Sequence, residues 1–143
     1  MNRLPTLSDA VATHARLAPN KLAARDSRRA MTFTALNQRV QRLAEGLCGL
    51  GLSTGDRVAV LAYNCVEWVE IYAALARAGL VAVPINFRLT GPEVAYIVSD
   101  ADVRAVIAGA VKLLTGAQVH SISGWKPARK AAFPVPVVTE RAA

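Results

Sequence analysis

The chain has 143 residues, of which 53% are apolar and 19% charged, and it carries a net charge of +7. This composition fits one folded domain with a core and excludes an intrinsically disordered chain, which combines low hydrophobicity with high charge. Residues 110–143 hold 5 basic residues and 1 acidic residue, whereas residues 1–109 hold 12 basic and 9 acidic residues. No basic stripe with interleaved aromatic residues appears, so we predict no nucleic-acid partner.

The first predicted element is a helix over Thr6–Leu17, where apolar residues recur at helical spacing. Ser8 is its expected N-cap, and Pro19-Asn20 ends it. Two short strands, Leu22–Asp26 and Ala30–Phe33, follow on either side of a polar turn. They are expected to form a hairpin.

A longer amphipathic helix is predicted from a cap at Thr34 to the Gly49-Leu50-Gly51 segment. The next strand, Arg57–Ala62, is almost continuously apolar, as buried parallel strands are. Asn64 is the expected cap of the following helix, because Glu67 lies three residues later, as in a capping box.

Gly79 is expected to end that helix. Val81–Val83 then begin the second strand of the parallel sheet, and Pro84 marks its end. Thr90 and Glu93 form a further capping box at the start of a helix.

A third apolar strand is predicted over Val103–Ala108. The order βαβαβ with short connections favours an α/β fold: a three-layer, mostly parallel sheet flanked by helices. After Gly109 no hydrophobic period survives, and residues 110–143 are predicted to be a divergent, basic and poorly ordered tail.

Nothing in the sequence predicts export or membrane insertion. The N-terminus lacks a basic segment followed by an apolar one, so no signal peptide is expected. The most apolar run, residues 71–85, is shorter than the roughly 20 residues that span a bilayer. Cys48 and Cys65 have neither CxxC nor zinc-site spacing, which favours reduced thiols and a cytoplasmic location.

Three segments carry a more specific signal: Met31–Leu36 (MTFTAL), Gly49–Cys65, and Ala76–Leu89 (ARAGLVAVPINFRL). In this order and spacing they resemble the N-terminal part of the AMP-forming acyl-CoA synthetases, a family of adenylate-forming, AMP-binding enzymes. Ala35 stands where that family usually has glutamate. The likeness makes residues 6–109 a partial adenylate-forming enzyme N-terminal domain.

The resemblance implies an activity for the full-length enzymes. They use ATP and Mg²⁺ to join a carboxylic acid to coenzyme A through an acyl-adenylate, and they release pyrophosphate and AMP. Their phosphate-binding loop and catalytic lysine lie beyond the matched region, and no Ser-Gly-Thr-Thr-Gly-like run occurs here. For this chain alone we therefore predict no catalytic residue, no metal ligand, no cofactor and no activity.

Arg88 is the candidate binding residue. It leaves the second strand at its C-terminal end, where ligands of open α/β sheets bind. The resemblance implies that an arginine in this loop lies near the coenzyme A nucleotide, and a guanidinium suits phosphate. A solvated loop arginine is the simpler interpretation. Trp68 and Tyr72 share a helix face and are expected to pack rather than stack on a ligand. His14 and His120 have no carboxylate or cysteine at useful spacing, so neither a triad nor a metal site is expected there.

The favoured hypothesis is an N-terminal piece of an acyl-CoA synthetase of fatty acid metabolism, truncated or frameshifted near Gly109. The alternative is a non-catalytic module that pairs with a full-length synthetase partner chain through the Trp68/Tyr72 face. An independent nucleotide-binding protein is disfavoured, because no GxGxxG follows any strand.

Overall fold

The structure is a computed structural model, and it describes residues 4–108 and 137–139. The chain divides into two compact units. The first comprises residues 1–55 and 64–81, and the second comprises residues 56–63 and 82–143. The elements in chain order are α1 (Leu7–Leu17), β1 (Leu22–Arg25), β2 (Ala30–Thr32), α2 (Phe33–Gly49), β3 (Arg57–Leu61), α3 (Glu67–Ala78), β4 (Val81–Ile85), α4 (Gly91–Asp100), β5 (Val103–Ala108) and β6 (Val137–Thr139).

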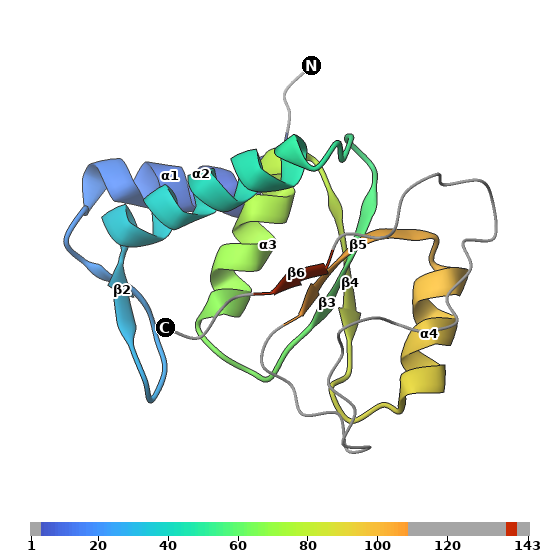
Figure 1. Ribbon diagram of the computed structural model, residues 1–143. Helices are drawn as coiled ribbons and strands as arrows, with labels where there is room; N and C mark the ends of the chain where they lie inside the picture. Colours follow the sequence, from blue (N-terminus) through green and yellow to red (C-terminus); the bar gives the residue numbers. More distant parts are fainter. Residues whose placement is uncertain (1–3, 109–136, 140–143) are drawn as a thin grey trace. The chain divides into compact units, whose positions relative to one another are not determined.

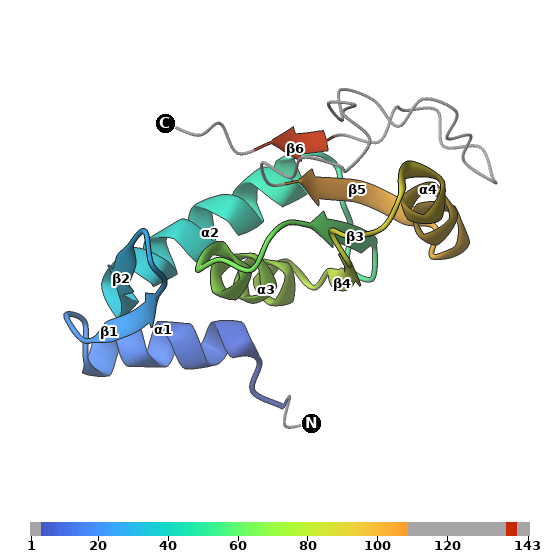
Figure 2. The ribbon, with the colours of Figure 1, turned by 90° about the horizontal axis from the view of Figure 1, so that it is seen from below.

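The first unit is a cluster of three helices, α1, α2 and α3, each of which contacts the other two (Figures 1 and 2). The antiparallel hairpin of β1 and β2, predicted from the sequence, belongs to the same unit. Its core is a set of apolar side chains from all three helices and the hairpin: Val11, Met31, Leu36, Val40, Ala44, Val66, Ala73 and Ala74.

Two of the predicted helix caps in this unit are wrong by two residues. Helix α1 is capped by Thr6, whose hydroxyl accepts from the backbone N–H of Asp9 while the Asp9 carboxylate accepts from the N–H of Thr6. The expected cap, Ser8, is instead a buried residue of the first turn. Helix α2 is capped by Thr32 rather than Thr34, because the hairpin strand runs directly into the helix.

Helix α3, by contrast, begins later than predicted. Its N-cap position is Val66, with no capping side chain from its own segment, so the expected capping box of Asn64 and Glu67 is absent. Glu67 is the first helical residue instead of the third. At the other end the prediction is confirmed: Gly79 ends the helix in the left-handed region, at φ 70°.

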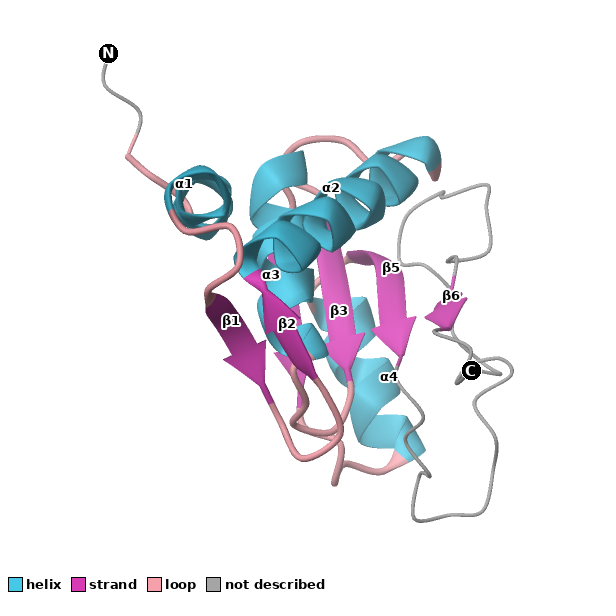
Figure 3. Ribbon diagram, turned by 90° about the vertical axis from the view of Figure 1, so that its left-hand side faces the viewer, coloured by secondary structure: helices cyan, strands magenta, loops and turns pink. Residues whose placement is uncertain are grey.

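The second unit is built on a sheet with the strand order β4-β3-β5-β6, of which Figure 3 labels β3, β5 and β6. Strand β5 pairs in parallel with both β3 and β6. Helix α4 begins with the predicted capping box of Thr90 and Glu93, and Val94 and Val98 pack it against apolar side chains of the sheet. A parallel sheet together with four helices in the described part of the chain confirms the predicted α/β class.

Pro84 lies inside β4 rather than after it. Among the described strands β4 lies at the edge of the sheet, which is the position where sheets tolerate proline. Strand β6 was not predicted at all, and it lies in the segment expected to be a tail. The division into residues 6–109 and 110–143 stays a prediction, since most of the second range lies outside the described residues.

Candidate functional site

Two aromatic side chains meet beyond the ends of neighbouring strands in the second unit. Tyr63 follows β3 and Phe87 follows β4, each two residues after the strand ends. Their ring centroids lie 4.6 Å apart at an interplanar angle of 57°. The contact places the C-terminal ends of both strands at one edge of the sheet, which is where open α/β sheets bind ligands.

Arg88 extends this aromatic pair with a positive charge. Its guanidinium carbon lies 5.5 Å from the centroid of the Phe87 ring, within the range of a cation–π contact. Its backbone N–H donates to Oδ1 of Asn86 at 3.0 Å, and the N–H of Leu89 donates to the Asn86 carbonyl at 3.1 Å. These bonds close a turn that fixes the loop, while the Arg88 side chain is exposed.

We call Tyr63, Asn86, Phe87 and Arg88 the strand-end site. An exposed guanidinium supplies planar, charged donors that suit a phosphate, and a half-buried aromatic ring supplies an apolar surface beside it. Of these residues the sequence predicted Arg88 alone. Tyr63 and Phe87 carried a signal that was missed, namely an aromatic residue placed just after each of two adjacent strands.

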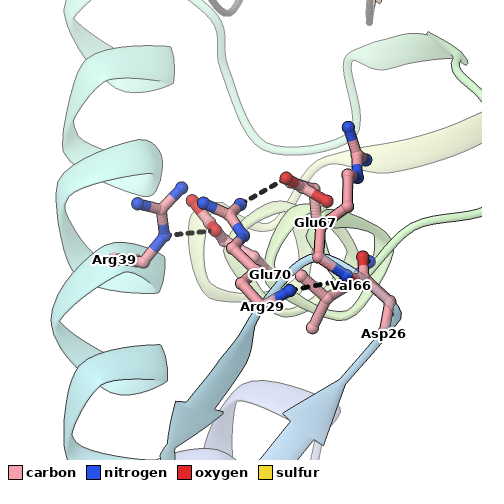
Figure 4. A network of polar contacts seen from close by, with 7 residues as sticks. Asp26, Arg29, Arg39, Val66, Glu67 and Glu70 are labelled. Atoms are coloured by element: carbon pink, nitrogen blue, oxygen red, sulfur yellow. Dashed lines mark hydrogen bonds and ion pairs between the residues drawn. The ribbon is translucent and has the colours of Figure 1, made fainter. Parts of the chain in front are cut away.

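A second group of polar side chains gathers at the N-terminal end of α3, in the first unit (Figure 4). Arg29 pairs with Glu67, and Nε of Arg39 donates to Oε2 of Glu70 at 2.6 Å. Asp26, at the tip of the hairpin, accepts the backbone N–H of Val66 at 3.0 Å. These contacts join the hairpin and α2 to α3.

The electrostatics of this second group indicate structural carboxylates rather than proton carriers. Backbone N–H donors of Val66, Arg29 and Arg28 lower the pKa of Asp26 to about 2. Burial by itself would raise the pKa of Glu67. The hydrogen bonds from the Cys65 thiol and from the backbone N–H of Glu67, together with the Arg29 charge, lower this pKa below its usual value. Both groups therefore remain ionised at neutral pH, and neither is poised as a general acid.

Cys65 lies beside these carboxylates and is not an activated thiol. Burial, followed by its hydrogen bond to Glu67 and the negative charge of that residue, raises its pKa to about 11. A nucleophilic cysteine needs a lowered pKa, so Cys65 has the opposite electrostatic environment.

Of the other four residues singled out in the sequence, the structure describes three. Trp68 and Tyr72 pack against each other with ring centroids 5.4 Å apart, as predicted. His14 stacks on Phe33 at 4.9 Å and lies at hydrogen-bond distance from the Ala10 carbonyl. His120 lies outside the described residues.

The described ranges, 4–108 and 137–139, contain neither a metal-ligand cluster nor a membrane-spanning helix. No group of three or more His, Cys, Asp or Glu side chains there is arranged to hold a metal ion. Within the same ranges, none of the helices has the length and apolar character needed to cross a membrane.

Comparisons with known proteins cover the strand-end site and most of the chain. A family model described as AMP-binding enzyme matches residues 11–140, which extends past Gly109, where the resemblance seen in the sequence ends. The long-chain-fatty-acid–CoA ligase FadD13 of Mycobacterium tuberculosis is 46% identical over 80 residues, covering 56% of this chain and 16% of that protein. Feruloyl-CoA synthase of an Amycolatopsis species is 41% identical over 93 residues, covering 65% and 19%.

Solved structures are also similar to this chain, in fold as well as in sequence. The N-terminal domain of FACL13 from M. tuberculosis has a TM-score of 0.71 and 37% identity, covering 75% of this chain and 28% of that one. The anthranilate–CoA ligase AuaEII in complex with anthranoyl-AMP has a TM-score of 0.71 and 28% identity, covering 77% and 21%. The chain thus spans less than a third of the length of the relatives described here.

Proposed function

The chain belongs to the AMP-binding enzyme family, and from this premise we propose that it supplies the N-terminal segment of the adenylating domain of an ATP-dependent acid–CoA ligase. The observation that carries the proposal is the family match over residues 11–140. The similarity to the solved N-terminal domain of FACL13, in both fold and sequence, supports the same position in the enzyme.

The proposed reaction converts a carboxylic acid, ATP and coenzyme A into acyl-CoA, AMP and pyrophosphate. The relatives are named for acids as different as a long-chain fatty acid and ferulic acid. Their common chemistry is activation of a carboxylate for transfer to a thiol. We therefore propose a carboxylic acid as the substrate class, without a defined acyl chain. The proposed compartment is the cytoplasm, where reduced cysteines such as Cys48 and Cys65 are usual.

Within that reaction we assign the strand-end site to the coenzyme A nucleotide. Arg88 has an exposed guanidinium on a loop whose backbone is fixed by the Asn86 turn, so the loop itself needs no reordering for the side chain to reach a ligand. A phosphate of coenzyme A is the matching anion, since guanidinium donors pair with phosphate oxygens in a planar, two-pronged geometry.

Among the residues that the structure describes, no group of carboxylates offers a fitting site for Mg²⁺. The carboxylates of the second polar group, Asp26, Glu67 and Glu70, are each held by donors from the protein. We therefore expect the isolated chain to form neither acyl-adenylate nor acyl-CoA.

The test of the proposed function is a chimera. The segment of M. tuberculosis FadD13 that corresponds to the same part of the family model is replaced by residues 11–140 of this chain, and acyl-CoA formation from a long-chain fatty acid is measured. We expect turnover well above that of FadD13 lacking its N-terminal segment. A folded chimera with no turnover would overturn the proposal. The isolated 143-residue chain is assayed in parallel and should be inactive.

Arg88 is tested in the same chimera. Arg88→Ala should raise KM for coenzyme A by about tenfold, the effect of losing about 1.4 kcal/mol of binding, and leave KM for ATP unchanged. Arg104→Ala is the matched control, because Arg104 is also an exposed arginine of the second unit. If the two variants have equal KM values for coenzyme A, Arg88 does not bind the coenzyme A nucleotide and is a solvated loop residue.

A further inference from the structure

The loop that joins β4 to α4 covers residues 86–90 and is anchored at both ends (Figure 1). Ile85, the last residue of β4, is buried, with 3% exposure. Thr90 is held at the other end, because the Glu93 carboxylate accepts both its backbone N–H and its hydroxyl at 2.8 Å. The backbone of residues 86–89, between these two anchors, therefore decides how the loop presents its side chains.

The side chains of residues 86–89 alternate between packed and exposed. Phe87 and Leu89 pack against the apolar cluster that α4 shares with the sheet. Asn86 and Arg88 are exposed on the other side of the loop. Because Asn86 buries little surface, its contribution to the loop comes from its polar carboxamide rather than from packing.

The Asn86 carboxamide holds the backbone of Arg88. Its Oδ1 accepts the N–H of Arg88 at 3.0 Å, and the main-chain carbonyl of Asn86 accepts the N–H of Leu89 at 3.1 Å. A side chain that bonds the backbone two residues later forms an Asx turn, which asparagine favours. This bond orients the peptide group between Phe87 and Arg88, and that orientation sets the direction in which the Arg88 side chain leaves the loop.

The Arg88 side chain is also held at its charged end. Its guanidinium carbon lies 5.5 Å from the centroid of the Phe87 ring, so the charge rests beside an aromatic ring while Asn86 holds the backbone. A guanidinium that is already oriented loses less conformational freedom when it binds a phosphate than one on a mobile backbone.

We propose that Asn86 is a positioning residue for coenzyme A. Its carboxamide oxygen fixes the backbone of Arg88 in the orientation from which the guanidinium pairs with a phosphate of coenzyme A. The inference rests on the proposed function, because it takes the ligand of Arg88 from the ligase reaction. Asn86 itself acts through Arg88 and needs no contact with the ligand.

The experiment measures KM for coenzyme A in the chimera that carries residues 11–140 of this chain. Asn86→Ala should raise this KM by about three- to tenfold, the effect of one lost hydrogen bond, and leave KM for ATP unchanged. Asn86→Ser should give an intermediate KM, because serine forms the same kind of turn more weakly. Asn20→Ala is the matched control, since Asn20 is also an exposed asparagine in a turn. The control should change KM for coenzyme A less than twofold.

A double-mutant cycle separates positioning of Arg88 from any other role. In an Arg88→Ala background, Asn86→Ala should change KM for coenzyme A less than twofold, because no guanidinium is left to position. A merely structural role would raise KM by the same factor in both backgrounds.

Hydrogen exchange in the 143-residue chain, followed by NMR, gives a measurement that needs no ligand. Asn86→Ala should speed exchange of the Arg88 amide. It should leave unchanged the amide of Val94, which donates to the Thr90 carbonyl at 3.0 Å in the first turn of α4.

Three results would each overturn the inference: an unchanged KM for coenzyme A in Asn86→Ala, additive effects of Asn86→Ala and Arg88→Ala, or an unchanged exchange rate of the Arg88 amide. Failure of the proposed function is distinct, because the parent chimera then has no turnover before any variant is made, and the inference fails with it. An active chimera whose KM responds to Arg88→Ala but not to Asn86→Ala would keep the ligase assignment and remove Asn86 as a positioning residue.

Discussion

The carboxylate of Asp26 accepts the backbone N–H of Val66 at 3.0 Å, across forty residues of sequence. Asp26 lies in the hairpin turn, and its other oxygen accepts the N–H groups of Arg28 and Arg29 at 2.8 and 2.9 Å. One side chain thus closes the turn and caps a helix that has no capping side chain of its own. The negative charge also suits the positive end of that helix.

This contact gives a pH-dependent contribution to stability. The pKa of Asp26 is lowered from 3.8 to about 2 in the folded chain, so folding favours the ionised form. The contribution is complete above the unfolded pKa, near pH 4, and is lost as the pH falls toward 2. Asp26→Asn should lower the urea midpoint at pH 7, and the difference from wild type should shrink between pH 4 and 2.

Asp100→Asn serves as the comparison, because Asp100 is an exposed carboxylate at the end of α4. Its urea midpoint should stay close to that of the wild type at pH 7. If Asp26→Asn and Asp100→Asn give the same midpoints across this pH range, the cap contributes nothing to stability.

The Asp26 contact also explains which features were predictable from the sequence. Gly79 and the Thr90–Glu93 pair were predicted correctly because a left-handed end and a capping box depend on residues a few positions apart. The start of α3 was missed because its cap comes from a distant hairpin. Asn64 has the right residue type, but the tertiary contact decides where the helix begins.

The same distinction applies to the strand-end site. The family resemblance and the position of Arg88 after β4 followed from local motifs, and the family is confirmed by the match over residues 11–140. The packing of Tyr63 on Phe87 depends on β3 and β4 being neighbours, so the aromatic residue after each strand is informative only once the strand order is known. Strand β6 is three residues long, too short to give a periodic signal.

A second prediction concerns the thiols. Cys48 is exposed, whereas burial and Glu67 raise the pKa of Cys65 to about 11. At pH 8 only about one Cys65 in a thousand is a thiolate, which is the reactive form. Iodoacetamide should therefore label the native chain quickly at Cys48 and slowly at Cys65, and both at similar rates in urea.

Glu67→Gln separates the causes, because it removes the charge that helps to keep Cys65 protonated. We expect faster alkylation of Cys65 in this variant, measured in a Cys48→Ser background. An unchanged rate would mean that burial alone protects the thiol.

A third prediction concerns the ion pair between Arg39 and Glu70. Glu70 is buried, with 7% exposure, and Arg39 is half-buried. Arg39→Met leaves the carboxylate without this partner and should cost about 1–3 kcal/mol of unfolding free energy. The double variant Arg39→Met/Glu70→Leu should recover most of the loss, because apolar residues often replace such a pair without cost. Additive losses in chemical denaturation would contradict this account.

The last prediction concerns Gly79, where helix α3 ends. Its φ of 70° is a conformation that side chains with a Cβ rarely adopt, and an added Cβ would lie 3.0 Å from Oγ1 of Thr54. Its backbone is also fixed, because the N–H of Gly55 donates to the Gly79 carbonyl at 2.8 Å. Gly79→Ala should therefore destabilise the fold by about 1–2 kcal/mol in thermal or urea unfolding.

Two comparison variants separate the two causes of this destabilisation, which are the contact with Thr54 and the positive φ. Gly46→Ala, within α2 and with no atom near an added Cβ, should stabilise the chain by about 0.5–1 kcal/mol, because alanine favours helix. Adding Thr54→Ala to Gly79→Ala should recover the part due to contact and leave the part due to the positive φ. Equal effects of alanine at positions 46 and 79 would mean that the left-handed helix end does not constrain this residue.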